Sequence, residues 1–261
     1  MDTKKLHQFL FIIIMFMFTN AFALDDKQEI VVAVSANFSP TLDKIITHFH
    51  EKNPTIKVKE VSSSSGSIYR QIVQGAPYNI FLAADELYIQ KLVEQNLVAT
   101  NNHFSYAEGI LALCSRTENI SNLNISQINS LLKNSDHIAI GDPTFAPYGI
   151  AAKQFLNSAA IYKDVEPKLV FTKDVAQVMN YLDTQAVSFG FVPLSLAKLS
   201  TTTACSQQNT WLVPTKNYTP IIQDAALTKN SEKNKYAQLF YNYLKSEDVK
   251  KIIADSNYKT L

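Results

Sequence analysis

Short apolar runs alternate with stretches of helical periodicity along almost the whole chain, and this alternation constrains the fold more than any other feature. The run 29–34 (EIVVAV) is rich in β-branched residues, as expected of a buried strand. The next segment opens with Ser39-Pro40 and repeats apolar residues three and four positions apart, which is typical of one face of a helix. Repeated strand–helix units predict a parallel sheet covered by helices.

The same patterns locate the other expected elements. The predicted strands are 29–34, 56–61, 79–83, 109–114, 137–140, 168–171, 187–192, 211–214 and 225–227. The first predicted helix runs from Ser39 to a stop at Asn53-Pro54. The other predicted helices cover 68–74, 87–93, 120–132, 149–156, 174–182, 236–244 and 249–253. We expect an α/β protein of two lobes, residues 24–108 with 226–261 and residues 109–225, with a ligand cleft at the carboxyl ends of the strands.

The first 23 residues are typical of a secretory signal peptide rather than of the fold. Lys4 and Lys5 precede ten apolar residues, FLFIIIMFMF, and Ala21 and Ala23 then form an Ala-x-Ala cleavage signal. A bilayer span needs about 20 apolar residues, so a membrane anchor is the weaker alternative. No cysteine follows the cleavage point closely enough for a lipid anchor. We expect a periplasmic protein.

The charge balance excludes some classes of partner. The full chain carries a net charge of +1, and removal of Lys4, Lys5 and Asp2 with the leader leaves equal numbers of acidic and basic residues. A neutral protein offers no electrostatic footprint for nucleic acid. Any bound anion must therefore be held by local dipoles rather than by a basic field.

Motifs for cofactors and catalysis are missing from the sequence. None of the six glycines belongs to a dinucleotide fingerprint, a phosphate loop or a Gly-x-Ser-x-Gly elbow. No Cys and His spacing matches a zinc site. These patterns predict a protein that is not an enzyme and that needs no cofactor. Cys114 and Cys205 are compatible with a disulfide, which secretion permits, and equally with two separate buried thiols.

Four strand-to-helix turns carry small polar residues or accessible amides. They are 36–40 (ANFSP), 63–67 (SSSGS), 147–149 (PYG) and 173–175 (KDV). Helix N-termini present unpaired N–H groups and about half a positive charge, so several of them aimed at one point can hold an anion without Arg or Lys. Each turn taken singly is also an ordinary helix cap. Their recurrence across both predicted lobes favours an anion site.

At these turns the sequence resembles the periplasmic molybdate-binding proteins of ABC transporters. The matching stretches, which follow the order of that family, are 32–45, 62–85, 139–156, 173–182 and 189–195. The resemblance implies a type II periplasmic-binding fold, in which each lobe is a mixed, mostly parallel sheet flanked by helices.

The resemblance also implies a ligand, a set of contacts and partners. The ligand is molybdate or tungstate, with molybdenum present only as the oxyanion. The contacts carried over by position are the side chain and amide of Asn37, Ser65, and the backbone amides of Tyr148 and Val175, with Ala36 and Ser64 as possible additions. The implied partners of a monomeric protein are a permease and its ATPase subunit.

Two positions depart from the family pattern. Pro193 stands where some members place a Tyr hydroxyl, and Lys173 lies beside Val175 in a site that is otherwise neutral. We expect Lys173 to point into solvent, because a lysine is rarely buried without a partner. Two alternatives stay open: the same scaffold could bind sulfate or thiosulfate, or a serine of 62–67 could serve a secreted hydrolase. Molybdate and tungstate are too similar in size to be separated from sequence.

Overall fold

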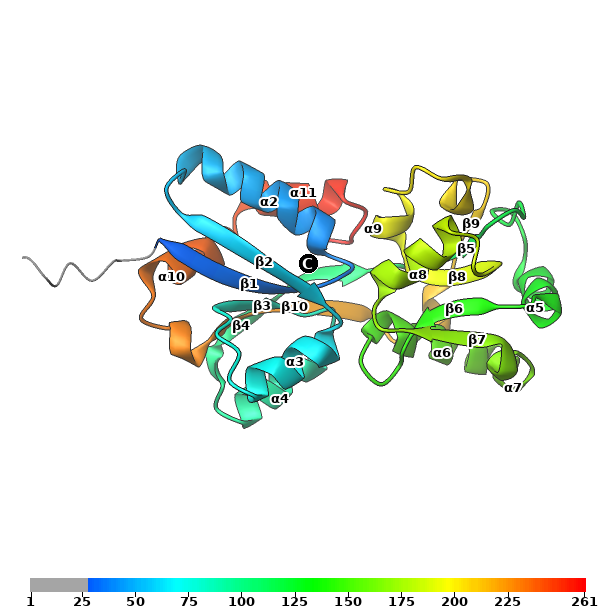
Figure 1. Cartoon of the computed structure of the whole chain (residues 1–261), viewed down its shortest axis with the longest axis horizontal. Helices are drawn as coiled ribbons and strands as arrows, with labels where there is room; N and C mark the ends of the chain where they lie inside the picture. Colours follow the sequence, from blue (N-terminus) through cyan, green and yellow to red (C-terminus); the bar gives the residue numbers. More distant parts are fainter. Residues whose placement is uncertain (1–27) are drawn as a thin grey trace, which may run out of the picture.

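The computed structural model describes residues 28–261, so the predicted signal peptide, residues 1–23, lies outside the described part. The described chain forms two five-stranded sheets that lie side by side, each flanked by helices (Figure 1). This arrangement confirms the predicted α/β class with two mixed sheets. No helix among residues 28–261 is long and apolar enough to cross a membrane.

The first sheet has the strand order β2-β1-β3-β10-β4. Its strands are β1 (Glu29–Ser35), β2 (Lys57–Ser63), β3 (Ile80–Leu82), β4 (Val98–Gly109) and β10 (Ile221–Thr228). Two groups of helices cover its two faces: α2 (Ser39–Lys52), α10 (Lys235–Tyr243) and α11 (Glu247–Asp255) on one, and α3 (Ser65–Val73) and α4 (Leu87–Glu94) on the other. Each face has a buried apolar cluster of its own, since side chains alternate across a strand.

The second sheet has the order β7-β6-β8-β5-β9. Its strands are β5 (Leu111–Ser115), β6 (Ile138–Gly141), β7 (Leu169–Thr172), β8 (Phe189–Pro193) and β9 (Thr210–Leu212). Its helices are α5 (Ile125–Asn134), α6 (Pro147–Ser158), α7 (Tyr162–Val165), α8 (Val175–Asp183) and α9 (Leu194–Ala197). Short 3-10 turns occupy Glu166–Lys168, Thr203–Cys205, Thr215–Asn217 and Lys229–Ser231.

The chain crosses between the sheets twice. Ile110 separates β4 from β5, and residues 213–220 lead from β9 back to β10. The strands beside these crossovers are the antiparallel ones, whereas β1 with β2 and β3, and β6 with β7 and β8, are parallel. We propose that each lobe consists of one sheet with its helices, with β10 joining the first lobe from Ile221 onward.

The structure differs from the expected elements in several places. The strand expected at 225–227 spans Ile221–Thr228, and the short helices α7 and α9 were not predicted. The helix expected over 120–132 begins only at Ile125, because Asn124 forms a capping box with Gln127 at that point. The twelve-residue strand β4 was not predicted, since its polar residues give no clear alternation. It lies at an edge of the sheet, where one side of the strand is partly exposed.

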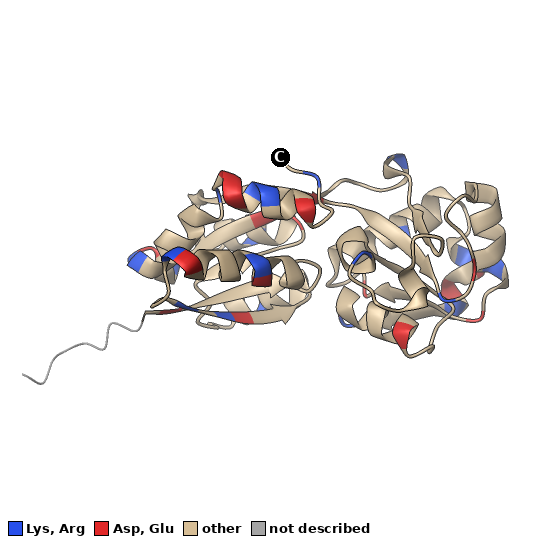
Figure 2. Ribbon diagram, turned by 90° about the horizontal axis from the view of Figure 1, so that it is seen from above, with Lys and Arg blue, Asp and Glu red and all other residues tan. Residues whose placement is uncertain are grey.

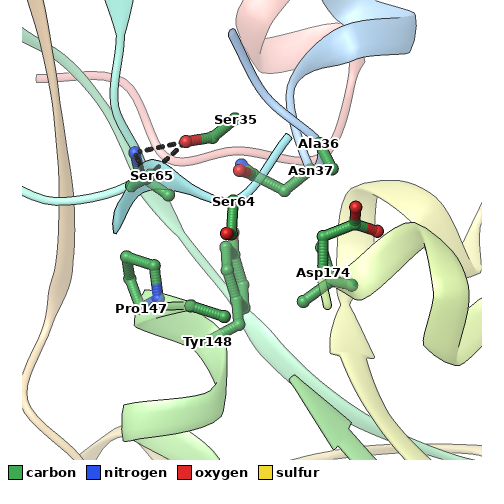
Figure 3. A pocket seen from close by; sticks show the side chains of 11 residues that line it. Ser35, Ala36, Asn37, Ser64, Ser65, Pro147, Tyr148 and Asp174 are labelled. Atoms are coloured by element: carbon green, nitrogen blue, oxygen red, sulfur yellow. Dashed lines mark hydrogen bonds between the residues drawn. The ribbon is translucent and has the colours of Figure 1, made fainter. Parts of the chain in front are cut away.

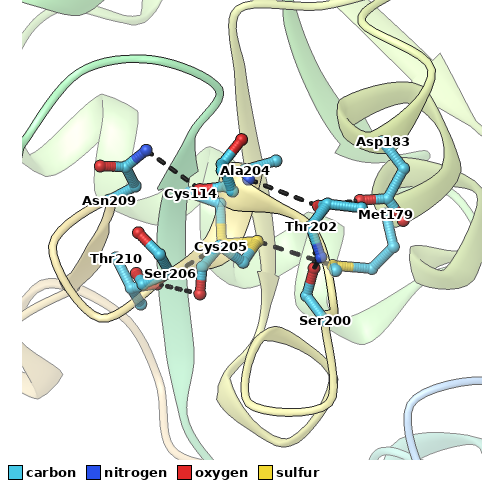
Figure 4. The surroundings of a disulfide bond; sticks show 11 residues. Cys114, Met179, Asp183, Ser200, Thr202, Ala204, Cys205, Ser206, Asn209 and Thr210 are labelled. Carbon is cyan, nitrogen blue, oxygen red and sulfur yellow. Dashed lines mark hydrogen bonds between the residues drawn. A yellow bond between two sulfur atoms is a disulfide. The ribbon is translucent and has the colours of Figure 1, made fainter.

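Cys114 and Cys205 form a disulfide across 91 residues of sequence (Figure 4). Cys114 lies in β5 and Cys205 in the 3-10 turn before β9, and both are buried. Of the two states left open by the sequence, the structure has the bridge. It ties the segment that leads into the edge strand β9 to the strand on which β9 pairs.

Candidate anion-binding site

A small cavity lies between the two lobes, at the carboxyl ends of β1 and β2 and the starts of α6 and α8 (Figure 3). It contains about 210 Å³ of atom-free space. All six residues predicted from the sequence line it, namely Ala36, Asn37, Ser64, Ser65, Tyr148 and Val175. Pro147 and Asp174, which belong to two of the polar turns identified in the sequence, also line it, together with Ser35, Ala84 and Ala146, which were not predicted. The structure therefore brings all the predicted site residues together.

Asn37 lies in the turn between β1 and α2 and is buried. Its side-chain nitrogen donates to Oε1 of Gln223 at 2.9 Å and to the hydroxyl of Tyr258 at 3.2 Å. The Tyr258 hydroxyl in turn donates to the Asn37 carbonyl at 2.7 Å. The backbone N–H of Asn37 has no hydrogen-bond partner within residues 28–261. The side-chain nitrogen thus holds the turn in place, and the backbone N–H is the donor left for a guest.

Ser35 and Ser65 form a hydroxyl pair at the floor of the cavity (Figure 3). The backbone N–H of Ala84 donates to both oxygens, at 3.1 Å to Ser35 and 2.9 Å to Ser65. One hydroxyl proton lies in the bond between the two serines, so the other remains available to a third partner. The pair therefore supplies one O–H donor, and Ser35 shares that role with Ser65.

Ser64 precedes α3 and belongs to the same serine run. Its hydroxyl donates to Oγ of Ser67 at 2.8 Å, whereas the hydroxyl of Ser65 contacts Ser35 and Ala84. Ser65 is thus the serine of the run whose hydroxyl belongs to the cavity floor, and Ser64 lines the cavity while bonding within its own helix start.

Tyr148 is the first residue of α6 that carries a backbone N–H, because Pro147 occupies the preceding helical position. Within residues 28–261 no acceptor binds that N–H. The Tyr148 side chain is buried, and its hydroxyl accepts from Nε2 of Gln223 at 3.2 Å. Burial raises the pKa of this hydroxyl well above its usual value, so it stays protonated.

Gly149 allows α6 to start close to the end of β6. A Cβ at this position would lie 1.9 Å from the Gly141 carbonyl oxygen, which no side chain could tolerate. The close approach brings the first turn of α6, with the Tyr148 amide, against the carboxyl end of the sheet.

Val175 begins α8, and Asp174 caps that helix by accepting the Gln177 backbone N–H at 3.1 Å. The Val175 side chain is buried, and its backbone N–H is not bonded by any described residue. Lys173 is exposed and does not line the cavity, as expected for a lysine that points into solvent. Pro193 is buried outside the cavity lining.

Among residues 28–261, no Lys or Arg lines the cavity. Its donors are one hydroxyl and the amides at the helix starts of both lobes, which carry partial positive charge. Charged residues of both signs are instead spread over the helices of the two lobes (Figure 2). Residues 28–261 contain no cluster of three His, Cys, Asp or Glu side chains that could hold a metal ion. Such a site suits a compact anion that brings acceptors only.

Sequence comparisons identify the family of this chain. The family described as bacterial extracellular solute-binding protein matches residues 30–259. The molybdate-binding protein ModA of Rhodobacter capsulatus is 34% identical over 233 residues, 89% of this chain and 88% of that protein. ModA of Azotobacter vinelandii is also 34% identical, over 88% of this chain and 89% of its own length.

Solved structures show the same architecture. The periplasmic molybdate-binding protein of Azotobacter vinelandii superimposes with a TM-score of 0.80 at 30% identity, over 89% of this chain and 99% of that one. The sulfate-binding protein SubI of Mycobacterium tuberculosis reaches a TM-score of 0.73 at 13% identity, over 89% and 87% of the two chains. At that identity the second likeness shows the fold alone.

Proposed function

Because this chain belongs to the family of bacterial extracellular solute-binding proteins, we propose that it captures molybdate, or its near-isostere tungstate, as the solute-binding component of an ABC importer. The names of its relatives support this ligand. The proposal includes secretion through a cleaved signal peptide, residence in the periplasm, a monomeric state, and delivery to a permease and its ATPase subunit. It involves no catalytic step.

One observation carries the proposal: helix starts from both lobes meet at one cavity, and no cationic side chain of the described part of the chain lines it. A tetrahedral dianion offers four acceptor oxygens and no donor. The matching donors are the amides of Asn37, Tyr148 and Val175 and the hydroxyl of the Ser35–Ser65 pair. Two of these donor groups come from each lobe, so the guest bonds both lobes only when they are together.

Capture then follows from the difference between open and closed states. The anion first contacts Asn37 and Ser65 on one lobe, and closure adds the amides of Tyr148 and Val175. A ligand drives closure only to the extent that it binds the closed state more tightly. The second-lobe amides provide that difference, and the closed form is the one we propose to dock on the permease.

The donor set also explains selectivity. Fixed donors fit one oxygen-to-oxygen spacing, and a smaller tetrahedron such as sulfate would leave hydrogen bonds longer than about 3.2 Å on one side. A protonated anion such as hydrogen phosphate needs an acceptor for its proton, and the amides and hydroxyl identified here present donors.

Titration calorimetry with molybdate, tungstate, sulfate and phosphate tests the proposal. Molybdate should bind the wild type, and Ser65→Ala should weaken binding by about 1–3 kcal/mol, or roughly 5- to 150-fold, because a donor to a charged guest is lost. Ser63→Ala is the matched control: its buried hydroxyl lies two residues before Ser65 at the end of β2, is outside the cavity lining and has no hydrogen-bond partner among the described residues. Equal affinity for sulfate and molybdate would refute the assignment.

The hydrolase alternative finds no support at the serine run. The Ser65 hydroxyl contacts Ser35 and the Ala84 amide, and no described His or carboxylate bonds to it as a general base would.

A further inference from the structure

A set of contacts between the lobes lies outside the cavity, at the rim formed by α3, α4 and the loop 142–146 that precedes α6. The Gly66 N–H donates to the Phe145 carbonyl at 2.9 Å, and the Tyr88 hydroxyl donates to the Thr144 carbonyl at 3.1 Å. The guanidinium carbon of Arg70 lies 4.0 Å from the centroid of the Phe145 ring. Since α3 and α4 pack on the first sheet and the loop follows a strand of the second, separation of the lobes at this rim would break all three contacts.

We propose that Arg70 and Phe145 form a closure latch, in which a cation over an aromatic ring holds the lobes together once the anion is inside. This inference rests on the proposed function. Arg70 is a positioning residue: it is absent from the cavity lining, and it acts by holding the Phe145 loop against α3. The Tyr148 amide lies three residues beyond Phe145, so the latch sets the distance between the donors of the two lobes.

The surroundings of Arg70 favour this role over that of an ordinary surface side chain. Within residues 28–261 its guanidinium makes one hydrogen bond, to the Ser67 hydroxyl at 3.4 Å, which is a long contact within its own helix. The interlobe approach is also tight, because a Cβ on Gly66 would lie 2.9 Å from the Phe145 Cα. The chain therefore keeps α3 free of a side chain at the point where the Phe145 loop is pressed against it.

A contact made only in the closed state slows release more than it affects capture. A cation–aromatic contact at an exposed position corresponds to a change of about two- to five-fold in an equilibrium constant. Arg70→Ala should therefore raise the rate constant for molybdate release by about that factor, and Arg70→Lys, which keeps the cation, should restore part of the loss.

Stopped-flow measurement of molybdate binding and release tests the latch, with Lys245→Ala as the matched control. Lys245 is an exposed cation that lies over Phe104 and Tyr241, on the face of the first sheet opposite to α3 and α4, so its loss changes the charge of the lobe without touching the rim. Arg70→Ala should speed release while Lys245→Ala does not. In a Phe145→Leu background Arg70→Ala should have no further effect. Equal release rates for Arg70→Ala and wild type, or additive effects of the two substitutions, would overturn the latch.

Amide hydrogen exchange of Gly66 in the ligand-free protein separates this proposal from the proposed function. That N–H is protected by Phe145 only while the lobes are closed. Arg70→Ala should speed its exchange about two- to five-fold and Lys245→Ala should leave it unchanged. If the wild type fails to bind molybdate, the assigned ligand is wrong, and unchanged Gly66 exchange in Arg70→Ala would independently show that the latch is wrong.

Discussion

Asp85 is a partly buried acid directly beside the cavity, since it follows Ala84, whose amide binds the serine pair. Its Oδ1 accepts the Tyr88 backbone N–H at 3.1 Å, and its Oδ2 is buried with no partner among residues 28–261. Burial raises the pKa of this carboxyl from 3.8 to about 6, and the opposing effects of the Tyr88 hydrogen bond and of Lys91 are smaller. The folded protein therefore binds the Asp85 proton more tightly than the unfolded chain does.

The substitution Asp85→Asn converts this shift into a measurable free energy. As pH rises from about 4 to about 6, the unfolded chain releases the proton before the folded protein does, so the free energy of unfolding of the wild type falls. Above pH 7 the full loss is up to about 3 kcal/mol. Asn binds no proton but keeps the oxygen that accepts from Tyr88. The free energy of unfolding of Asp85→Asn, relative to wild type, should rise by roughly 2.4 kcal/mol between pH 4 and pH 7.5.

Urea denaturation of both ligand-free proteins at pH 4, 5, 6 and 7.5 measures this difference. Any constant effect of the new amide group cancels, because only the change with pH is compared. Glu86→Gln, a substitution of the exposed neighbouring acid, is the control and should show no comparable trend. Parallel pH curves for Asp85→Asn and wild type would refute the reasoning.

Three further substitutions test other parts of the structure. Gly66→Ala should weaken molybdate binding at least about ten-fold, because the new Cβ would lie 2.5 Å from the Tyr88 hydroxyl and 2.9 Å from the Phe145 Cα; calorimetry that shows full affinity would contradict the tight interlobe approach. Replacing Cys114 and Cys205 with Ser should lower the free energy of unfolding by up to about 4–5 kcal/mol, because a 91-residue loop is opened in the unfolded chain, and unchanged urea midpoints would argue against the bridge. Tyr258→Phe should cost about 1–3 kcal/mol in urea unfolding, since the buried Asn37 carbonyl loses its 2.7 Å donor; a neutral result would mean that another donor replaces it.

Local sequence patterns predict much of this fold because buried strands and amphipathic helices each have a characteristic period. The run that forms β1 and the Ser39-Pro40 start of α2 are examples, and both lie where the sequence places them. β4 cannot be predicted from a local pattern, because its stability comes from pairing with β10, more than a hundred residues later in the chain. The start of α5 depends on a side-chain cap at Asn124, which a periodicity argument places several residues too early.

The candidate site likewise has a part that can be predicted from local sequence and a part that cannot. Helix-start motifs and the family resemblance predict the residues that line the cavity, because those features are local. The groups behind them are not local: Asn37 is held by Gln223 and Tyr258, which lie 186 and 221 residues further along the chain. Ser35 could have been found from its position at the end of the first strand, next to Ala36. Only the folded structure shows that its hydroxyl forms a hydrogen bond with that of Ser65.

The position of β10 in the first sheet affects the order in which the two sheets can fold. This strand lies between β3 and β4, which do not pair with each other, so the sheet cannot be completed until residues 221–228 have left the ribosome. The second sheet needs nothing beyond β9 and can assemble earlier. The amino-terminal half of the cleft is therefore the last to mature, and the nascent chain stays incompletely folded for most of its synthesis.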